Sequence, residues 1–189
     1  MTSFDFELQY LKAGAVELEA YLLSAELYWP IGIRVSRGEK AYPRLTLGNL
    51  SIARVKASVL AASPVQKDAF EDVADQITAA QNQWRSAWGR KASSEYRSRI
   101  NLWRNFLDDY RQHPASHFDR YGYEVERRAL LQLLADDADE VRGREDLLLD
   151  SLDQYLKAII VPGGFIWDTD LEPGFPQDPY WYLYGLLRE

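Results

Sequence analysis

The chain has 189 residues, a net charge of −7 and no cysteine, which excludes disulfides, thiol nucleophiles and cysteine-based metal sites. Apolar residues make up 47% and charged residues 27%, as is usual for a globular protein with one sizeable core. Charges such as Glu17 and Glu26 interrupt the apolar runs well before the roughly twenty residues of a membrane span. No basic segment precedes an apolar run at the start, so a cytoplasmic location is expected.

The first predicted element is a long helix. Apolar residues spaced three and four positions apart predict it over residues 5–28, and Pro30 ends it. Residues 30–45 combine proline, glycine and basic side chains, and we expect them to form a loop. Thr46 is the expected N-cap of a second helix that reaches about Ala62.

The start of the third helix is the best-marked junction in the chain. Ser63 supplies a hydroxyl cap, Pro64 suits the first helical position, and Gln66 stands where a capping box requires it. The apolar spacing that follows predicts a helix as far as about Trp88.

Three further helices are expected in the second half. The fourth begins near Ser93 and ends before Pro114. Ser116 opens a fifth, whose end falls between residues 135 and 143. A sixth, rich in leucine, spans residues 147–160. Apolar stripes of this length bury against one another, so the sequence predicts an all-α fold, a single bundle of five to six mostly antiparallel helices.

The last part of the chain differs in composition. We expect residues 1–161 to form the helical bundle and residues 162–189 to form an irregular C-terminal extension of the same domain, packed on it. The extension is rich in proline and in aromatic residues, whereas disordered tails are poor in aromatics. It either covers the open end of the bundle or binds a partner. Its candidate partner-binding residues are Phe165, Trp167, Phe175, Tyr180, Trp181, Tyr182 and Tyr184.

Basic residues form a second candidate site. Arginines recur every seven residues beside the apolar seam of the fourth helix, and others lie in the loop before the second. They either bind phosphates or an acidic partner, or pair with acidic flanks within the bundle. The candidate anion-binding residues are Arg34, Arg37, Arg44, Arg97, Arg104 and Arg111. A net-acidic chain disfavours nucleic acid as the ligand.

Acidic residues suggest an alternative with a metal. Carboxylates spaced i and i+3 occur at the end of the fifth helix and again on the sixth, and facing acidic pairs are what a Mg²⁺-dependent phosphohydrolase requires. The alternative metal ligands are Asp136, Asp137, Asp139, Glu140, Asp150 and Asp153. The simpler interpretation is a solvated helix end. His113 and His117 are separated by Pro114, so we expect them to interact with helix ends.

The sequence lacks a nucleophile elbow, a glycine-rich phosphate loop and the Glu-x-x-His pairs of di-iron bundles. We therefore expect a non-catalytic interaction or adaptor protein without a cofactor. It would act through a protein–protein interface, with another protein or with a second copy of itself. The alternatives are the Mg²⁺-dependent phosphohydrolase, and nucleic-acid or acidic-partner binding through the arginine-rich faces.

Overall fold

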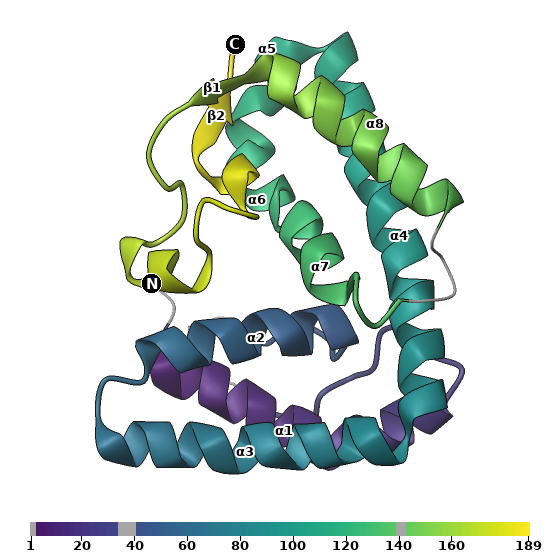
Figure 1. Ribbon diagram of the computed structural model, residues 1–189, viewed down its shortest axis with the longest axis vertical. Coiled ribbons are helices and arrows are strands. Elements are labelled where there is room, and N and C mark those ends of the chain that lie inside the picture. Colours follow the sequence, from purple (N-terminus) through teal and green to yellow (C-terminus); the bar gives the residue numbers. More distant parts are fainter. Residues whose placement is uncertain (1–2, 34–40, 139–142) are drawn as a thin grey trace.

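The computed structural model describes residues 3–33, 41–138 and 143–189, and these form a mainly α-helical fold (Figure 1). The α-helices of these ranges are α1 (Phe4–Leu23), α2 (Leu47–Leu60), α3 (Pro64–Gln83), α4 (Arg85–Gln112), α5 (Pro114–His117), α6 (Tyr121–Glu124), α7 (Glu126–Leu134) and α8 (Arg144–Ile159). Shorter 3₁₀ helices are η1 (Phe118–Arg120), η3 (Thr169–Gly174) and η4 (Trp181–Leu183). Strands β1 (Ile160–Pro162) and β2 (Gly185–Leu187) form an antiparallel pair.

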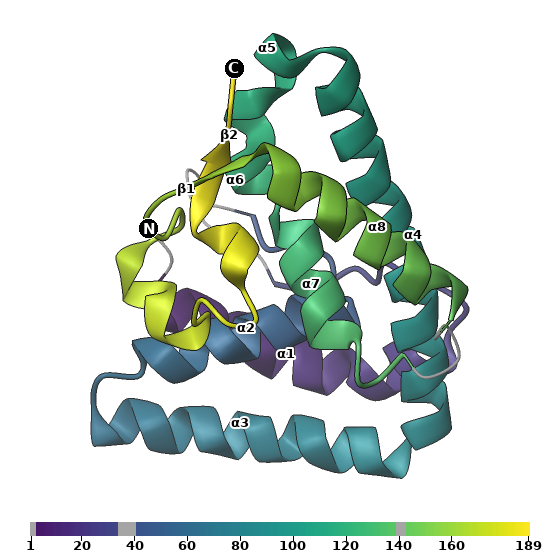
Figure 2. The ribbon, with the colours of Figure 1, turned by 45° about the horizontal axis from the view of Figure 1, so that its top comes forward.

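The helices lie in two groups that α4 connects. α1, α2 and α3 lie together at one end of the molecule, α5 lies at the other, and α7 lies between α2 and α8 (Figures 1 and 2). The mainly α-helical class is as predicted, but a single bundle of five to six mostly antiparallel helices is not confirmed. One reason is that the fifth predicted helix is divided into α5, η1, α6 and α7, because the backbone leaves the helical region at His117 (φ −132°, ψ −12°).

Two predicted helix starts are confirmed by their caps. The Thr46 hydroxyl accepts a hydrogen bond from the Asn49 N–H (3.1 Å) at the start of α2. At α3, the Ser63 hydroxyl accepts from the Gln66 N–H, and the Gln66 side chain accepts from the Ser63 N–H in return. These bonds satisfy N–H groups that a helix leaves without intrahelical partners.

The first helix ends earlier than predicted. α1 stops at Leu23, and the Ser24 hydroxyl donates to the Tyr21 carbonyl (2.8 Å), a polar group that the next helical turn would have covered. The chain then bends, and Trp29 pairs with Leu45 through two backbone hydrogen bonds. The apolar spacing continues beyond the helix because Trp29 also packs against the core.

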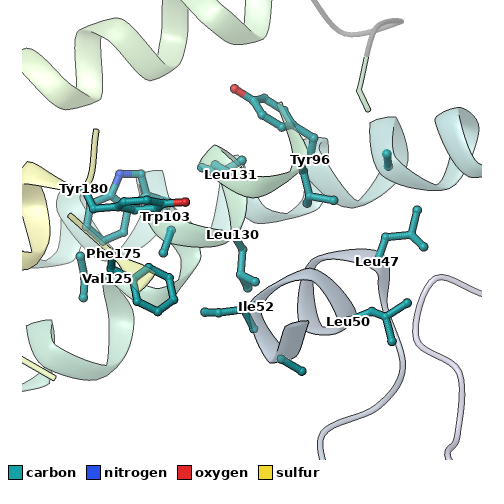
Figure 3. Packing of buried hydrophobic residues seen from close by; sticks show 14 of the residues in the cluster. Leu47, Leu50, Ile52, Tyr96, Trp103, Val125, Leu130, Leu131, Phe175 and Tyr180 are labelled. Carbon is teal, nitrogen blue, oxygen red and sulfur yellow. The ribbon is translucent and has the colours of Figure 1, made fainter. Parts of the chain in front are cut away.

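The core is formed where α2, α4 and α7 meet. Side chains of α7 point between those of α2 and α4, and the aromatic residues of the C-terminal segment close the far side (Figure 3). Labelled members of this cluster are Leu47, Leu50, Ile52, Tyr96, Trp103, Val125, Leu130, Leu131, Phe175 and Tyr180. None of the described helices is long and apolar enough to cross a membrane.

The C-terminal segment is irregular and packs closely on the helices. A Cβ on Gly174 would lie 2.7 Å from Val55 Cγ1 of α2, so only glycine lets η3 approach this helix. Likewise, a Cβ on Gly185 would lie 2.5 Å from the Val161 carbonyl oxygen across the β1–β2 pair. The Tyr110 hydroxyl of α4 donates to the Arg188 carbonyl (2.9 Å) and fixes the end of the chain.

Loss of the hydroxyl should change the free energy of unfolding differently at two buried tyrosines of this junction. Tyr121 donates to the Tyr182 carbonyl (2.6 Å), whereas the buried Tyr182 hydroxyl has no hydrogen-bond partner among the described residues. We expect Tyr121→Phe to lower the free energy of unfolding by about 1–3 kcal/mol, because it orphans a buried carbonyl. Tyr182→Phe should leave it unchanged or higher. Urea denaturation measures both, and an equal loss would show that the Tyr182 hydroxyl is bonded.

Candidate anion-binding cleft

A cleft of about 410 Å³ lies between α4 and the start of α8. Its lining combines three guanidinium groups with an amide, a carboxylate and two apolar side chains. The lining residues are Arg97, Ile100, Asn101 and Arg104 of α4 and Arg144, Glu145 and Leu148 of α8. The α4 residues recur at i, i+3, i+4 and i+7, so they share one face of the helix.

The arginines of this cleft differ in their partners. Arg97 forms an ion pair with Glu145 (3.5 Å), which joins α4 to α8. No hydrogen bond or ion pair connects Arg104 or Arg144 to another described residue, and both are exposed. Three guanidinium groups therefore face one carboxylate, and the cleft carries an excess of positive charge.

The free guanidinium groups set the chemistry of the cleft. Each offers up to five N–H donors in a planar fork that fits a carboxylate or a phosphate. An exposed ion pair contributes only about 0.2–1 kcal/mol, because water and salt screen it. One contact would bind an anion very weakly, so useful affinity requires a ligand that reaches Arg104 and Arg144 together.

The cleft unites only part of the predicted anion-binding set. Arg97 and Arg104 line it, whereas Arg111 pairs locally with Asp108 (3.5 Å). Arg44 lies elsewhere, and its side chain donates to the Tyr28 carbonyl (3.5 Å). The other two predicted residues, Arg34 and Arg37, lie outside the described residues.

Sequence reasoning missed Arg144, one of the two cleft arginines that have no partner among the described residues. It is the first residue of α8 and follows Gly143, whose φ of +116° favours glycine. A basic side chain at a helix N-terminus is unfavourable, because the helix dipole is positive there. The sequence alone contains no signal for Arg144, because the predicted helix begins only at residue 147 and the start of α8 at Arg144 is known from the structure.

Of the predicted metal ligands, two are held by neighbouring side chains. Both oxygens of Asp137 accept hydrogen bonds, one from Gln81 (3.0 Å) and one from the Trp88 indole (2.9 Å). Asp153 accepts two from Arg128, at 2.9 and 2.8 Å. Asp137 thus links α7 to α3 and α4, while Asp153 links α8 to the first half of α7.

The remaining predicted ligands do not complete a metal site in the described structure. Asp136 and Asp150 are exposed, and Asp139 and Glu140 lie outside the described residues. Within the ranges that the structure covers, no group of three or more His, Asp or Glu side chains could hold a metal ion. The two histidines lie at helix ends: His113 follows α4, and His117 ends α5.

The seven aromatic residues proposed for partner binding are all buried or half-buried. Their rings form edge-on contacts with one another, as between Trp167 and Phe175 (5.2 Å between centroids). The Trp167 indole donates to the Gly122 carbonyl (3.0 Å), and the Lys157 ammonium lies over the Trp181 ring (5.0 Å). These contacts support the interpretation of the segment as a cover; binding of a partner at its rim stays a prediction.

The interior also contains buried charged side chains, which the sequence pattern did not indicate. Glu124 is 1% exposed and forms ion pairs with Arg120 (2.6 Å) and Arg127. Burial lowers the pKa of Arg127 and of Lys91. The Lys91 ammonium donates to the Ser24 hydroxyl (3.2 Å) and to a carbonyl just after α1. Glu124 thereby links η1, α6 and α7, and Lys91 links α4 to the end of α1.

No family model, curated protein or solved structure matches this chain. Its function must therefore be argued from the cleft and the surfaces themselves.

Proposed function

We propose that the protein is a non-catalytic interaction protein that binds an acidic segment of a protein partner in the α4–α8 cleft. The observation that carries the proposal is that Arg104 and Arg144, on opposite walls of one cleft, have no hydrogen-bond or ion-pair partner among the described residues. Leaving two cations unpaired beside each other is electrostatically unfavourable in the free protein, and an anion between them relieves this repulsion. The apolar side chains of Ile100 and Leu148 add a surface for the aliphatic parts of a peptide.

An acidic protein segment fits the cleft better than nucleic acid does. The chain as a whole carries a net charge of −7, which repels a polyanion at long range. Single-stranded nucleic acids are bound by exposed aromatic side chains that stack on the bases, and the cleft lining contains none. A short acidic peptide needs only local charge complementarity, and its side chains can reach both free arginines.

Replacing both free arginines by alanine should weaken the binding of an acidic peptide at least tenfold. The probe is a fluorescein-labelled peptide rich in Asp and Glu, followed by fluorescence anisotropy. We expect the affinity of the wild-type protein to fall as salt is raised, because exposed charges are screened. A peptide of the same length with Asn and Gln in place of the acids should not bind.

The matched control for this experiment is Arg90→Ala. Arg90 is also an exposed arginine of α4, but it does not line the cleft. The control variant should bind the acidic peptide as the wild type does. Equal affinities of wild type, Arg90→Ala and Arg104→Ala/Arg144→Ala, or no binding by the wild type at low salt, would contradict the proposed function.

A further inference from the structure

The outer face of α3 carries an acidic stripe. Four exposed carboxylates occupy two successive turns at i, i+3, i+4 and i+7, and no hydrogen bond or ion pair connects any of them to another described residue. They are Asp68, Glu71, Asp72 and Asp75. The opposite face of α3 is buried through Val73 and Ile77, which contribute to the core. α3 is therefore held in place while its charged face is open to solvent.

The charged residues of the acidic stripe on α3 and of the cleft on α4 have the same spacing along their helices. Asp68 and Asp75 are seven residues apart, as are Arg97 and Arg104 on α4. At 1.5 Å per residue, each set extends about 10 Å along its helix axis. Helices that lie side by side can place charges with this common repeat opposite one another. Arg144 lines the same cleft from the α8 side.

We infer that the acidic segment bound in the α4–α8 cleft is α3 of a second copy of this chain. This inference rests on the proposed function and names its partner. α3 and α8 lie on opposite sides of α2 in both views, so a molecule does not present its own stripe to its own cleft (Figures 1 and 2). The contact joins two different surfaces, and such heterologous contacts build rings or open chains.

The net charge of the chain makes this self-association specific. Two copies that each carry −7 repel one another at long range, so association without a complementary contact is disfavoured. The contact must be supplied locally by the free arginines and carboxylates. Neutralising either partner surface should therefore be enough to abolish it.

Sedimentation of two complementary variants tests the inference. The cleft variant is Arg104→Ala/Arg144→Ala, and the stripe variant is Glu71→Gln/Asp72→Asn/Asp75→Asn, which keeps side-chain size. At low salt the wild type should form species larger than its 21.8 kDa monomer, while each variant alone should associate at least tenfold more weakly. Mixed together, the variants should form a 1:1 complex, because one supplies an intact stripe and the other an intact cleft.

Neutralisation at a different place provides the control. Glu19→Gln/Glu26→Gln removes two exposed carboxylates that lie outside α3, and this variant should associate as the wild type does. A wild type that stays monomeric at high concentration and low salt, or a mixture that forms no complex, overturns the inference.

The acidic-peptide measurement separates the two proposals. If the peptide still binds in a manner that depends on Arg104 and Arg144 while the chain stays monomeric, the proposed function stands and its partner is a different protein. If neither the peptide nor a second copy binds, both proposals fail. The stripe variant keeps its cleft, so it must bind the peptide at least as tightly as the wild type.

Discussion

Replacing Glu95 by alanine should lower the free energy of unfolding by about 3–5 kcal/mol, the usual cost of removing one partner of a buried ion pair. Glu95 lies on α4 and its side chain is fully buried. Its carboxylate accepts hydrogen bonds from the Thr46 hydroxyl (2.7 Å), the Gly48 N–H (2.9 Å) and the Arg99 guanidinium (3.0 Å). One side chain thereby fixes the start of α2 against the middle of α4.

The expected loss is large because alanine leaves several polar groups without a partner. Arg99 is only 12% exposed and would keep its charge with no carboxylate beside it. The Gly48 N–H belongs to the first turn of α2, where no intrahelical carbonyl is available to it. A negative charge at this position also interacts favourably with the helix dipole of α2. All these interactions are lost together.

Two further substitutions show whether the charge or the shape of Glu95 is responsible. Glu95→Gln keeps the size and one acceptor oxygen, so its loss should be clearly smaller than that of Glu95→Ala. In Gly48→Ala, the new Cβ would lie 2.7 Å from Glu95 Oε1 and should cost about 1–3 kcal/mol by overpacking. Urea denaturation followed by tryptophan fluorescence measures all three. A loss below about 1 kcal/mol for Glu95→Ala would contradict this account.

The elements that the sequence predicted correctly are those that local chemistry determines. The caps at Thr46 and Ser63 need only residues three positions apart, and both are confirmed. Glu95 could not be predicted in the same way, because its partners at residues 46 and 48 are distant in the sequence. A glutamate between Ser94 and Tyr96 has the same local pattern whether it faces solvent or another helix.

Only the α4 wall of the cleft could be predicted from the sequence. The seven-residue repeat of arginines placed Arg97 and Arg104 on one face of α4, as any helical periodicity does. Which neighbour covers that face depends on how α8 packs on α4, and α8 is distant from these arginines in the sequence. Arg144 and Glu145 therefore became part of the site only through the tertiary structure.

The same reasoning explains why acidic residues were open to two interpretations. Asp137 and Asp150 are each part of an acidic group in the sequence, yet the first bonds with Trp88 and the second is exposed. A run of carboxylates does not contain the information on which of them will meet an indole, a guanidinium or water. Long-range packing decides this, and it also decides the role of Asp153.

Removing Asp153 should cost about 3–5 kcal/mol, and removing its partner as well should restore much of the loss. Arg128 of α7 is 6% exposed and donates two parallel hydrogen bonds to the Asp153 carboxylate of α8. Its guanidinium also lies over the Tyr182 ring, 4.6 Å from the centroid. The pair therefore joins α7, α8 and the C-terminal segment.

The charge state of Arg128 determines the size of this effect. Burial alone would lower the pKa of Arg128, but the hydrogen bonds to Asp153 and the neighbouring charges raise it above its usual value. Arginine therefore stays protonated, and in Asp153→Ala a buried cation keeps, among the described residues, Gln132 (3.4 Å) and the Tyr182 ring as partners. The lost bidentate contact is the kind that stabilises most.

A double-mutant cycle with Arg128→Met and Asp153→Leu measures the coupling. Methionine keeps the length of the buried side chain over Tyr182 without its charge, and leucine has a size close to that of aspartate. Because the two residues are in direct contact, we expect a coupling free energy of about 1–3 kcal/mol, with the double variant more stable than Asp153→Leu alone. Additive losses in urea denaturation would show that Arg128 and Asp153 stabilise the fold independently. In that case α8 would be held to the core by its apolar face, through Leu152 and Leu156.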